Sequence, residues 1–457
     1  MPLFEHALEH EDAHLLQALV ITQRHVNPND QRIIDALNKF TWLNNSAILT
    51  PLLQAGANPN QQDTLGNTPL ITAIQLGKKE AVMALLNANA DPNLTDYNGL
   101  SPLKTATRLG QTTIVQHLLQ RGALPNLTDN EGCTALIHAA SQGMKMVIQL
   151  LIAYKADPHW VDTHGMNALH FAIKNGHSEI VELLLGYKVD PNLRDDNGVT
   201  PLISATIHND ITSMGLLLKG KADPNLQQEE AKRTALIRAV INHSVDATRL
   251  LLNYGAKPDL QDGLGQSALI YAAAQNNTHI IKMLLGAGAT LDMADNAGQT
   301  ALLHAAYFGH VETARYLVNA GANPNQQDNQ GMTPLIYSLY TSNTETIVRI
   351  LLNTPAIDLD IADSSRRTVL HHAAENNMPV IVQWLLSQQA DPNKKDIYGR
   401  TTFITAIEHG HSDIVWLLLA TGRANLHEKD CFGRNALDNA RIRGNTTIIS
   451  LLLNVLA

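Results

Sequence analysis

A phrase of about fifteen residues returns along this chain every 33 residues, and no other feature constrains the fold as strongly. It stands as DTLGNTPLITAIQLG from Asp63 to Gly77 and as DYNGLSPLKTATRLG from Asp96 to Gly110. A unit this short cannot bury its apolar face alone, so neighbouring copies must stack on one another. The 457 residues therefore predict one elongated body with a continuous core, although length alone suggests about two to four domains.

An acidic residue opens each copy of the phrase and marks the register. It recurs about every 33 residues, with a one-residue slip before Glu229 and a two-residue insertion before Asp363. The positions are Asp63, Asp96, Asp129, Asp162, Asp195, Glu229, Asp262, Asp295, Asp328, Asp363, Asp396 and Asp430. Two degenerate copies precede them, and the first ends in NPND near Asp30. We count about fourteen units with no linker between them.

Each position in the phrase has a physical role, as DDNGVTPL shows. Asn197 and Gly198 adopt positive φ at low cost, so they suit a tight hairpin. Thr200 stands where a helix N-cap belongs, and Pro201 suits the first helical position because its missing N–H would be unpaired there. A glycine such as Gly176 ends this helix in the left-handed conformation, and SEIVELLLGY supplies a second apolar-faced helix.

Composition excludes several classes of protein. The net charge is −9 without a polybasic block, which argues against nucleic-acid or anionic-membrane binding as the main role. Two cysteines make no disulfide framework and fit a reducing compartment. No apolar run approaches the ~18–20 residues of a spanning helix, and the first residues do not resemble a signal peptide. We expect a cytoplasmic monomer without cofactors, with secretion into a host cell as the alternative.

The phrase resembles the ankyrin repeat. The matching features are the 33-residue period, the T-P-L-x-x-A start, Gly-His after the first helix and IVxLLL in the second, as in TALLHAAYFGHVETARYLV from Thr300 to Val318. The resemblance implies an all-α solenoid, curved, with about fourteen helix-turn-helix units whose β-hairpin loops project to one side. It also implies non-catalytic protein binding through the hairpin tips and the concave first-helix face. The family's histidine after T-P-L is kept at His170 and His371 and is mostly replaced elsewhere.

The ends and two irregular places divide this array. We expect degenerate N-terminal capping repeats over 1–62, the repeat array over 63–429, and a C-terminal capping repeat over 430–457. Arg441 supports the last boundary, because a further unit would bury its charge. The array is irregular near 228–233 and 352–367, where Lys232 and Arg366 replace the hairpin glycine. A non-glycine residue held at positive φ there costs about 1 kcal/mol.

Catalytic and metal-binding alternatives rest on few residues. Cys133 follows a hairpin glycine, and an exposed thiol beside His138 or His164 would be a nucleophile. His6, His10 and His14 have i, i+4 spacing, which chelates a metal only if one helix continues through all three. The unbroken repeat register leaves no room for a hidden enzyme fold, so we expect no catalytic site and no metal site.

Differences between copies indicate where a partner binds. An exposed aromatic and apolar group is predicted at Tyr307 and Phe308, at the end of one first helix, with Met332 and Tyr340 on the next unit. Arg367, Arg400 and Arg434 follow successive hairpins and would form a ladder that either steers an acidic partner or pairs with the hairpin acids. A secondary partner-binding patch is predicted from Leu65, Leu76, Tyr97, Leu100 and Leu109.

The sequence therefore favours a scaffold or adaptor that binds one or more proteins. An effector of an intracellular bacterium or pathogen that captures a host protein is the alternative, with the same binding mechanism. An anionic small ligand on the arginine ladder is a minor alternative. The resemblance also implies that a hairpin asparagine such as Asn93, Asn192 or Asn325 can be a hydroxylation substrate.

Overall fold

The computed structural model describes residues 2–22 and 30–456, so most of the NPND segment near Asp30 lies outside the described residues. The described residues form 28 helices, which make fourteen consecutive pairs. The chain divides into two compact units, Met1–Glu229 and Glu230–Ala457, and the division falls inside the irregular segment 228–233.

Unit 1 contains seven helix pairs. Its first helices are α1 (Pro2–Glu9), α3 (Gln31–Trp42), α5 (Pro69–Gln75), α7 (Pro102–Arg108), α9 (Ala135–Ser141), α11 (Ala168–Lys174) and α13 (Pro201–Ile207). Its second helices are α2 (Ala13–Thr22), α4 (Ser46–Gln54), α6 (Lys79–Asn87), α8 (Thr112–Gln120), α10 (Lys145–Ala153), α12 (Ser178–Gly186) and α14 (Ile211–Lys219).

Unit 2 contains the other seven pairs. Its first helices are α15 (Ala235–Ile241), α17 (Ala268–Ala274), α19 (Ala301–Tyr307), α21 (Pro334–Ser338), α23 (Val369–Glu375), α25 (Thr402–Glu408) and α27 (Ala436–Arg443). Its second helices are α16 (Val245–Asn253), α18 (Thr278–Gly286), α20 (Val311–Asn319), α22 (Thr344–Leu352), α24 (Pro379–Ser387), α26 (Ser412–Ala420) and α28 (Thr446–Leu456).

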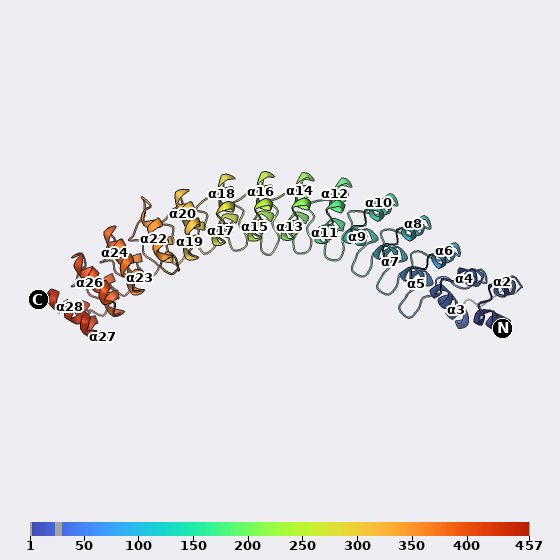
Figure 1. The fold of residues 1–457 in the computed structure, drawn as a ribbon, viewed down its shortest axis with the longest axis horizontal. Coiled ribbons are helices and arrows are strands. Elements are labelled where there is room, and N and C mark those ends of the chain that lie inside the picture. The colour runs from blue at the N-terminus through green and yellow to red at the C-terminus, as the bar shows by residue number, and fades with distance from the viewer. Residues whose placement is uncertain (1, 23–29, 457) are drawn as a thin grey trace. The chain divides into compact units, whose positions relative to one another are not determined.

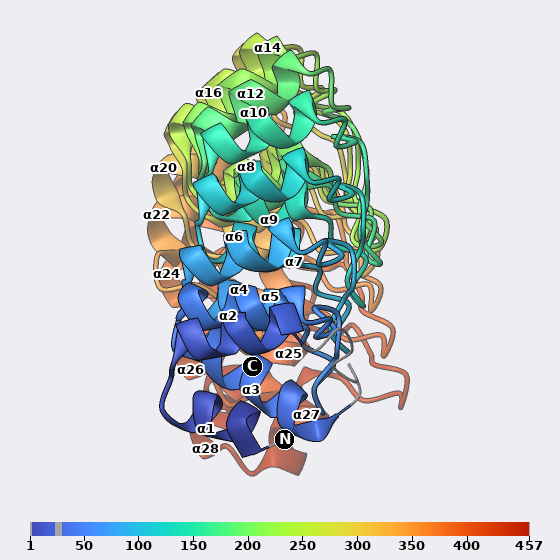
Figure 2. The same cartoon turned by 90° about the vertical axis from the view of Figure 1, so that its right-hand side faces the viewer.

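Within each unit the first helices form one row and the second helices form another (Figure 1). The hairpin loops project beyond the row of first helices, and Figure 2 shows the loops of each unit gathered on one side of its helices. We call the side with the first helices and hairpins the first-helix face, and the opposite side the second-helix face. The predicted all-α architecture of stacked helix pairs is confirmed.

The local structure of a repeat follows its phrase. Helix α13 begins at Pro201, and the Thr200 hydroxyl accepts a hydrogen bond from the amide of Ile203 at 3.3 Å, as the N-cap prediction requires. The carboxylate of Asp195 accepts from the amides of Asn197 at 3.0 Å and Val199 at 2.8 Å. The opening acid therefore holds the hairpin by satisfying amides that would otherwise be unpaired.

The two irregular hairpins carry backbone strain. Lys232 has φ 50° and Arg366 has φ 61°, so both occupy the left-handed conformation that glycine adopts in the regular copies. The prediction that these residues replace a glycine of positive φ is confirmed. Hydrogen bonds that close the turn stabilise this strained backbone. One example is the 2.7 Å bond from the Arg366 amide to the Asp363 carbonyl.

An asparagine ladder joins neighbouring repeats. The side-chain oxygen of Asn93 accepts from the amide of Leu124 at 2.8 Å, and Asn126 makes the same bond with Asp157, 31 residues on. After the insertion, Asn325 accepts from the amide of Asp358 at 2.9 Å with a separation of 33 residues. The two extra residues are therefore accommodated before Asp358, where the ladder returns to its register.

The core consists of small and aliphatic side chains. Fully buried alanines such as Ala205 and Ala305 lie in the middle of the first helices, where they let neighbouring helices approach closely. Leucine, isoleucine and valine fill the space between the two rows, and Phe40 and Phe403 are large fully buried aromatic side chains. In the described part of the chain, every helix is too short or too polar to cross a membrane.

Candidate functional site

Two adjacent aromatic side chains stand out on the first-helix face of unit 2. Tyr307 is the last residue of α19 and Phe308 is its C-cap, and their side chains are 54% and 51% exposed. Their ring centroids lie 5.0 Å apart at 86°, an edge-to-face arrangement. Phe308 also lies nearly parallel to the rings of His304 and His310, at 6.2 Å and 5.8 Å. The pair is thus ordered although it is half exposed.

Tyr337, which was not predicted from the sequence, contacts this pair from the next repeat. Its ring meets that of Tyr307 edge to face at 5.4 Å, and its hydroxyl donates to the Asp328 carboxylate at 2.6 Å. Burial and this bond raise the pKa of Tyr337, so the phenol stays protonated. A signal exists in the sequence, because Tyr337 follows its hairpin acid by nine residues, as Tyr271 follows Asp262.

The predicted neighbours Met332 and Tyr340 occupy different places. Met332 is half-buried behind its hairpin, where its backbone closes the turn with Asp328. Tyr340 is 53% exposed, but its hydroxyl lies 2.7 Å from Nδ1 of His372 in the following repeat. It follows α21, which has five residues where α19 has seven. The ring that contacts Tyr307 is therefore that of Tyr337.

A buried histidine anchors Tyr340. The His372 side chain is 1% exposed, and its Nε2 lies 3.1 Å from Oδ2 of Asp363. Burial, reinforced by the nearby Arg367 guanidinium, lowers the pKa of His372 to about 4. The ring is neutral at pH 7, so Nε2 donates to Asp363 and Nδ1 accepts from Tyr340. This chain of bonds fixes the exposed Tyr340 ring.

The three predicted arginines form a ladder of ion pairs. In each case Nε and Nη2 of the guanidinium both contact Oδ2 of the residue's own hairpin acid: Arg367 at 3.1 Å, Arg400 at 2.7–2.8 Å and Arg434 at 2.8 Å. Nη1 of Arg367 also contacts Glu375 at 3.0 Å, and Nη1 of Arg400 contacts Glu408 at 2.9 Å. The geometry therefore supports pairing of the arginines with the hairpin acids and not steering of an acidic partner. The carboxylates neutralise the positive charge of the ladder.

Aromatic residues at two hairpin tips contact the arginines of the ladder. The Arg400 guanidinium is 4.8 Å from the ring of Tyr398, and that of Arg434 is 4.6 Å from the ring of Phe432. Tyr398 is 50% exposed and Phe432 is 72% exposed. Neither residue was predicted from the sequence, although an aromatic ring at a hairpin tip is unusual in a chain with 4% aromatics.

The secondary patch lies in unit 1. Leu65 and Tyr97 are both 67% exposed at adjacent hairpin tips, joined by a 3.3 Å bond from the Tyr97 amide to the Leu65 carbonyl. Leu76 and Leu109 are exposed C-caps of α5 and α7, the position that Phe308 holds on α19. Leu100 is half-buried.

The geometry at Cys133 does not support the nucleophile alternative. The residue is 4% exposed, and burial with nearby carboxylates raises the pKa of its thiol to about 12, so no thiolate forms near neutral pH. His138 instead bonds to Oδ2 of Asp129 at 2.9 Å, and His164 has a largely exposed side chain. A thiolate nucleophile is therefore absent from this hairpin.

The histidine triplet near the N-terminus lacks the helix that it needs. Helix α1 ends at Glu9 and α2 begins at Ala13, so no single helix passes through His6, His10 and His14. Nδ1 of His10 lies 3.0 Å from the carbonyl of His6, a local contact at a helix end. Among residues 2–22 and 30–456, no three His, Cys, Asp or Glu side chains gather as a metal site would require.

A comparison with protein-family models agrees with this architecture. The family model described as "Ankyrin repeats (3 copies)" matches residues 33–129, 115–195, 187–262, 254–328, 320–396 and 381–456. The chain therefore belongs to the ankyrin-repeat family, whose members are in general non-catalytic modules of protein–protein interaction. A similar solved structure is the ankyrin repeat domain of Bcl-3, described as a unique member of the IkappaB protein family. It is 27% identical, with a TM-score of 0.45, and the match covers 48% of this chain and 99% of that one. No curated relative matches the sequence.

Proposed function

We propose that this protein is a non-catalytic scaffold or adaptor that binds a partner protein on its first-helix face and hairpin tips. The observation that carries the proposal is the exposed, ordered pair Tyr307 and Phe308. Aromatic side chains are enriched at the centres of protein interfaces, where they bury a large area at little entropic cost. The equivalent pair on α17 is Ala274 and Gln275, so the repeat itself does not require aromatic rings there.

Preorganisation of the aromatic rings supports the same surface. Tyr307 is held by Tyr337, whose hydroxyl is fixed on Asp328. Tyr340 is held by His372 one repeat further on. A partner that docks on these rings does not have to order them, which lowers the cost of association.

The arginine ladder supplies the polar rim of the proposed surface. Because Arg367, Arg400 and Arg434 are paired with carboxylates, they give ordered hydrogen-bond donors more than long-range attraction. The tips at Tyr398 and Phe432 extend the apolar area beside this rim, and Met332 contributes the exposed part of its side chain.

The patch made of Leu65, Leu76, Tyr97, Leu100 and Leu109 is the proposed second contact, in unit 1. Leu76 and Leu109 occupy the same C-cap position as Phe308 of unit 2, and Leu65 and Tyr97 lie at the adjacent hairpin tips. The contacts would be the same for a partner from the cell that makes the protein and for one from a host cell that receives it.

The test is the variant Tyr307→Ala with Phe308→Ala. The intact protein is immobilised, captured proteins are identified by mass spectrometry, and the Kd of the purified partner is measured for each variant. We expect binding at least tenfold weaker, since an interface aromatic contributes ~2 kcal/mol or more. The thermal midpoint should barely move, because both rings are half exposed.

A matched control is Tyr154→Ala with Tyr187→Ala, which removes two exposed rings (each 38% exposed) from the C-caps of α10 and α12. It should leave binding unchanged. If the Tyr307 and Phe308 variant binds normally but melts much earlier, the pair belongs to the core and the patch in unit 1 becomes the better candidate.

A further inference from the structure

Four successive second helices of unit 2 carry a basic residue at the same position. They are separated by 33, 33 and 34 residues, and all are exposed: Arg249 on α16, Lys282 on α18, Arg315 on α20 and Arg349 on α22. We call these four residues the basic row. The equivalent positions in unit 1 are neutral or acidic: Gln116, Gln149, Glu182 and Gly215. Because unit 1 lacks it, the row is not a consequence of the repeat phrase.

The charges of the basic row are only partly paired. Arg249 lies 3.1 Å from Asp246 and Arg315 lies 3.6 Å from Glu312, and such exposed pairs contribute little to stability. Lys282 lies over the ring of Tyr316 at 5.4 Å, and Arg349 lies over that of Trp384 at 4.3 Å.

No carboxylate of the described residues forms an ion pair with Lys282 or Arg349. The arginine ladder on the first-helix face is instead fully paired, at Arg367, Arg400 and Arg434. Lys282 and Arg349 on the second-helix face therefore differ from the arginine ladder, because their charges are not neutralised by a carboxylate.

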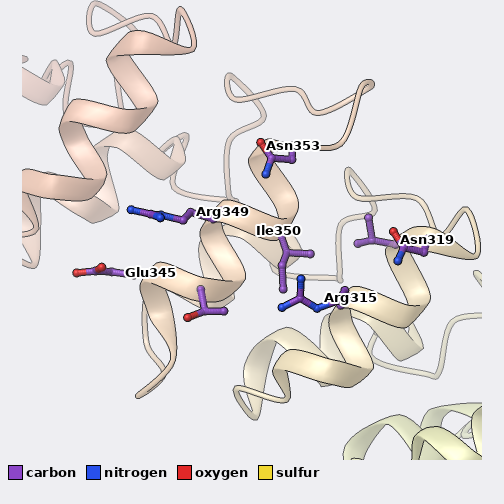
Figure 3. Close-up of a pocket in the computed structure, with 8 residues that line it drawn as sticks. Arg315, Asn319, Glu345, Arg349, Ile350 and Asn353 are labelled. Atoms are coloured by element: carbon purple, nitrogen blue, oxygen red, sulfur yellow. The ribbon is translucent and has the colours of Figure 1, made fainter.

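Grooves run between the helices that carry the basic row. The groove between α20 and α22 has a volume of about 550 Å³ and is lined by Arg315, Asn319, Ile350 and Asn353 among others. Figure 3 shows Arg315 and Ile350 facing each other across it, while Arg349 extends on the other side of α22. A smaller groove of about 340 Å³ lies between α16 and α18, and Asn253 lines it at the end of α16.

The spacing of the basic row selects the kind of ligand. Packed helices of neighbouring repeats lie roughly 10 Å apart. A peptide in the polyproline II conformation advances about 3.1 Å per residue and has three residues per turn, so side chains three positions apart lie on the same face and cover roughly the same distance. We propose that the second-helix face of unit 2 binds an extended acidic peptide segment whose Asp or Glu residues are three positions apart. Each carboxylate then lies opposite one cation, and the amides of Asn253, Asn319 and Asn353 are placed to bond the peptide backbone.

An acidic row limits other polyanions. Asp246, Glu312 and Glu345 lie about one turn before their cations on the same helices and are exposed. Duplex DNA carries a charge about every 1.7 Å of its axis, so it would place phosphates over these carboxylates as well as over the cations. An anionic membrane surface would do the same. A peptide with spaced carboxylates avoids this repulsion.

The experiment uses the full chain and two fluorescent peptides of equal composition. One repeats Glu-Gly-Ser four times, and the other has its four glutamates in a single run. Binding is measured by fluorescence anisotropy at low and high salt. We expect the spaced peptide to bind at least fivefold tighter than the clustered one, with an affinity that falls as salt rises.

A matched pair of variants locates the site. Lys282→Gln with Arg349→Gln removes two positive charges from the basic row and should weaken the spaced peptide at least fivefold. Gln116→Glu with Gln149→Glu changes the net charge by the same amount at equivalent positions of unit 1, and it should alter binding less than twofold. All four side chains are exposed, so both variants are expected to fold, which circular dichroism checks.

Three outcomes would overturn the proposal. Equal affinity for the two peptides, or an equal loss of affinity for the spaced peptide in both variants, would show that net charge alone causes the binding. Binding of phosphatidylserine vesicles or of a single-stranded DNA oligonucleotide through Lys282 and Arg349, without binding of the spaced peptide, would assign the row to another polyanion. This test does not involve Tyr307 or Phe308, so it stands apart from the proposed function.

Discussion

Replacing His372 by asparagine tests whether a buried neutral histidine makes unit 2 sensitive to acid. Asparagine is the chain's own alternative, because Asn439 holds the equivalent place and its Nδ2 donates to Oδ2 of Asp430 at 3.2 Å. His372→Asn keeps a donor for Asp363 but removes the titrating ring and the acceptor for Tyr340. The variant should be less stable than the natural protein at pH 7.5, because the Tyr340 hydroxyl loses its bond to Nδ1 of His372.

The amount of stability lost in acid follows from the pKa of His372, which burial lowers from 6.5 to about 4. The unfolded chain binds a proton near pH 6.5 and the folded one only near pH 4, so stability is lost as pH falls through this window. At 1.36 kcal/mol per pKa unit the full loss is roughly 3 kcal/mol, of which about 2 kcal/mol has occurred at pH 5. Asp363 stays ionised throughout, because its neighbours hold its pKa below the ordinary value.

Native-state hydrogen exchange of the α23 amides, corrected for the intrinsic rate at each pH, measures this local stability. The natural protein and His372→Asn differ in the local free energy of unfolding at pH 7.5. This difference should shrink by about 2 kcal/mol between pH 7.5 and pH 5, because only the natural protein has a titrating side chain at position 372. His371 titrates in both proteins, so its contribution cancels. A difference that stays constant across this range would refute the claim that His372 is buried in its neutral form.

Two further predictions follow from local geometry. Lys232→Gly should raise the free energy of unfolding of its repeat by about 1 kcal/mol, because glycine adopts the φ of 50° without strain, and slower hydrogen exchange near the hairpin would show it. Iodoacetamide at pH 8 should alkylate the exposed Cys431 and leave Cys133 unmodified in the folded protein, because the pKa of Cys133 is raised to about 12. Mass spectrometry of the folded and the denatured protein measures the labelling, and equal labelling of both cysteines in the folded protein would contradict this prediction.

The sequence by itself determined the repeat architecture. A period of 33 residues, the Thr200 and Pro201 helix start and the left-handed glycines are local signals, and each acts through a few neighbouring residues. Those signals agree in almost every copy, so the helix pairs could be placed before any contact was known. Even the strained Lys232 and Arg366 were predictable, because a hairpin that lacks its glycine still has to turn.

Only the tertiary structure decided which side chains meet. Tyr340 looked like a neighbour of Tyr307 in sequence, but the shortened α21 leaves Tyr340 bonded to His372, and Tyr337 holds the aromatic pair. The Arg400 guanidinium turned out to be neutralised by Asp396 and Glu408. Such pairings depend on distances of a few ångströms between repeats, which a periodic pattern does not encode.

The same reason applies to the basic row on the second-helix face. The sequence shows that Lys282 and Arg349 are cations at equivalent positions, but not whether a carboxylate pairs with either. Stacking of the helices decides this, because it places the rings of Tyr316 and Trp384 beneath the two charges. Local signals fix the repeat, whereas the charge that remains available on each face depends on packing between repeats.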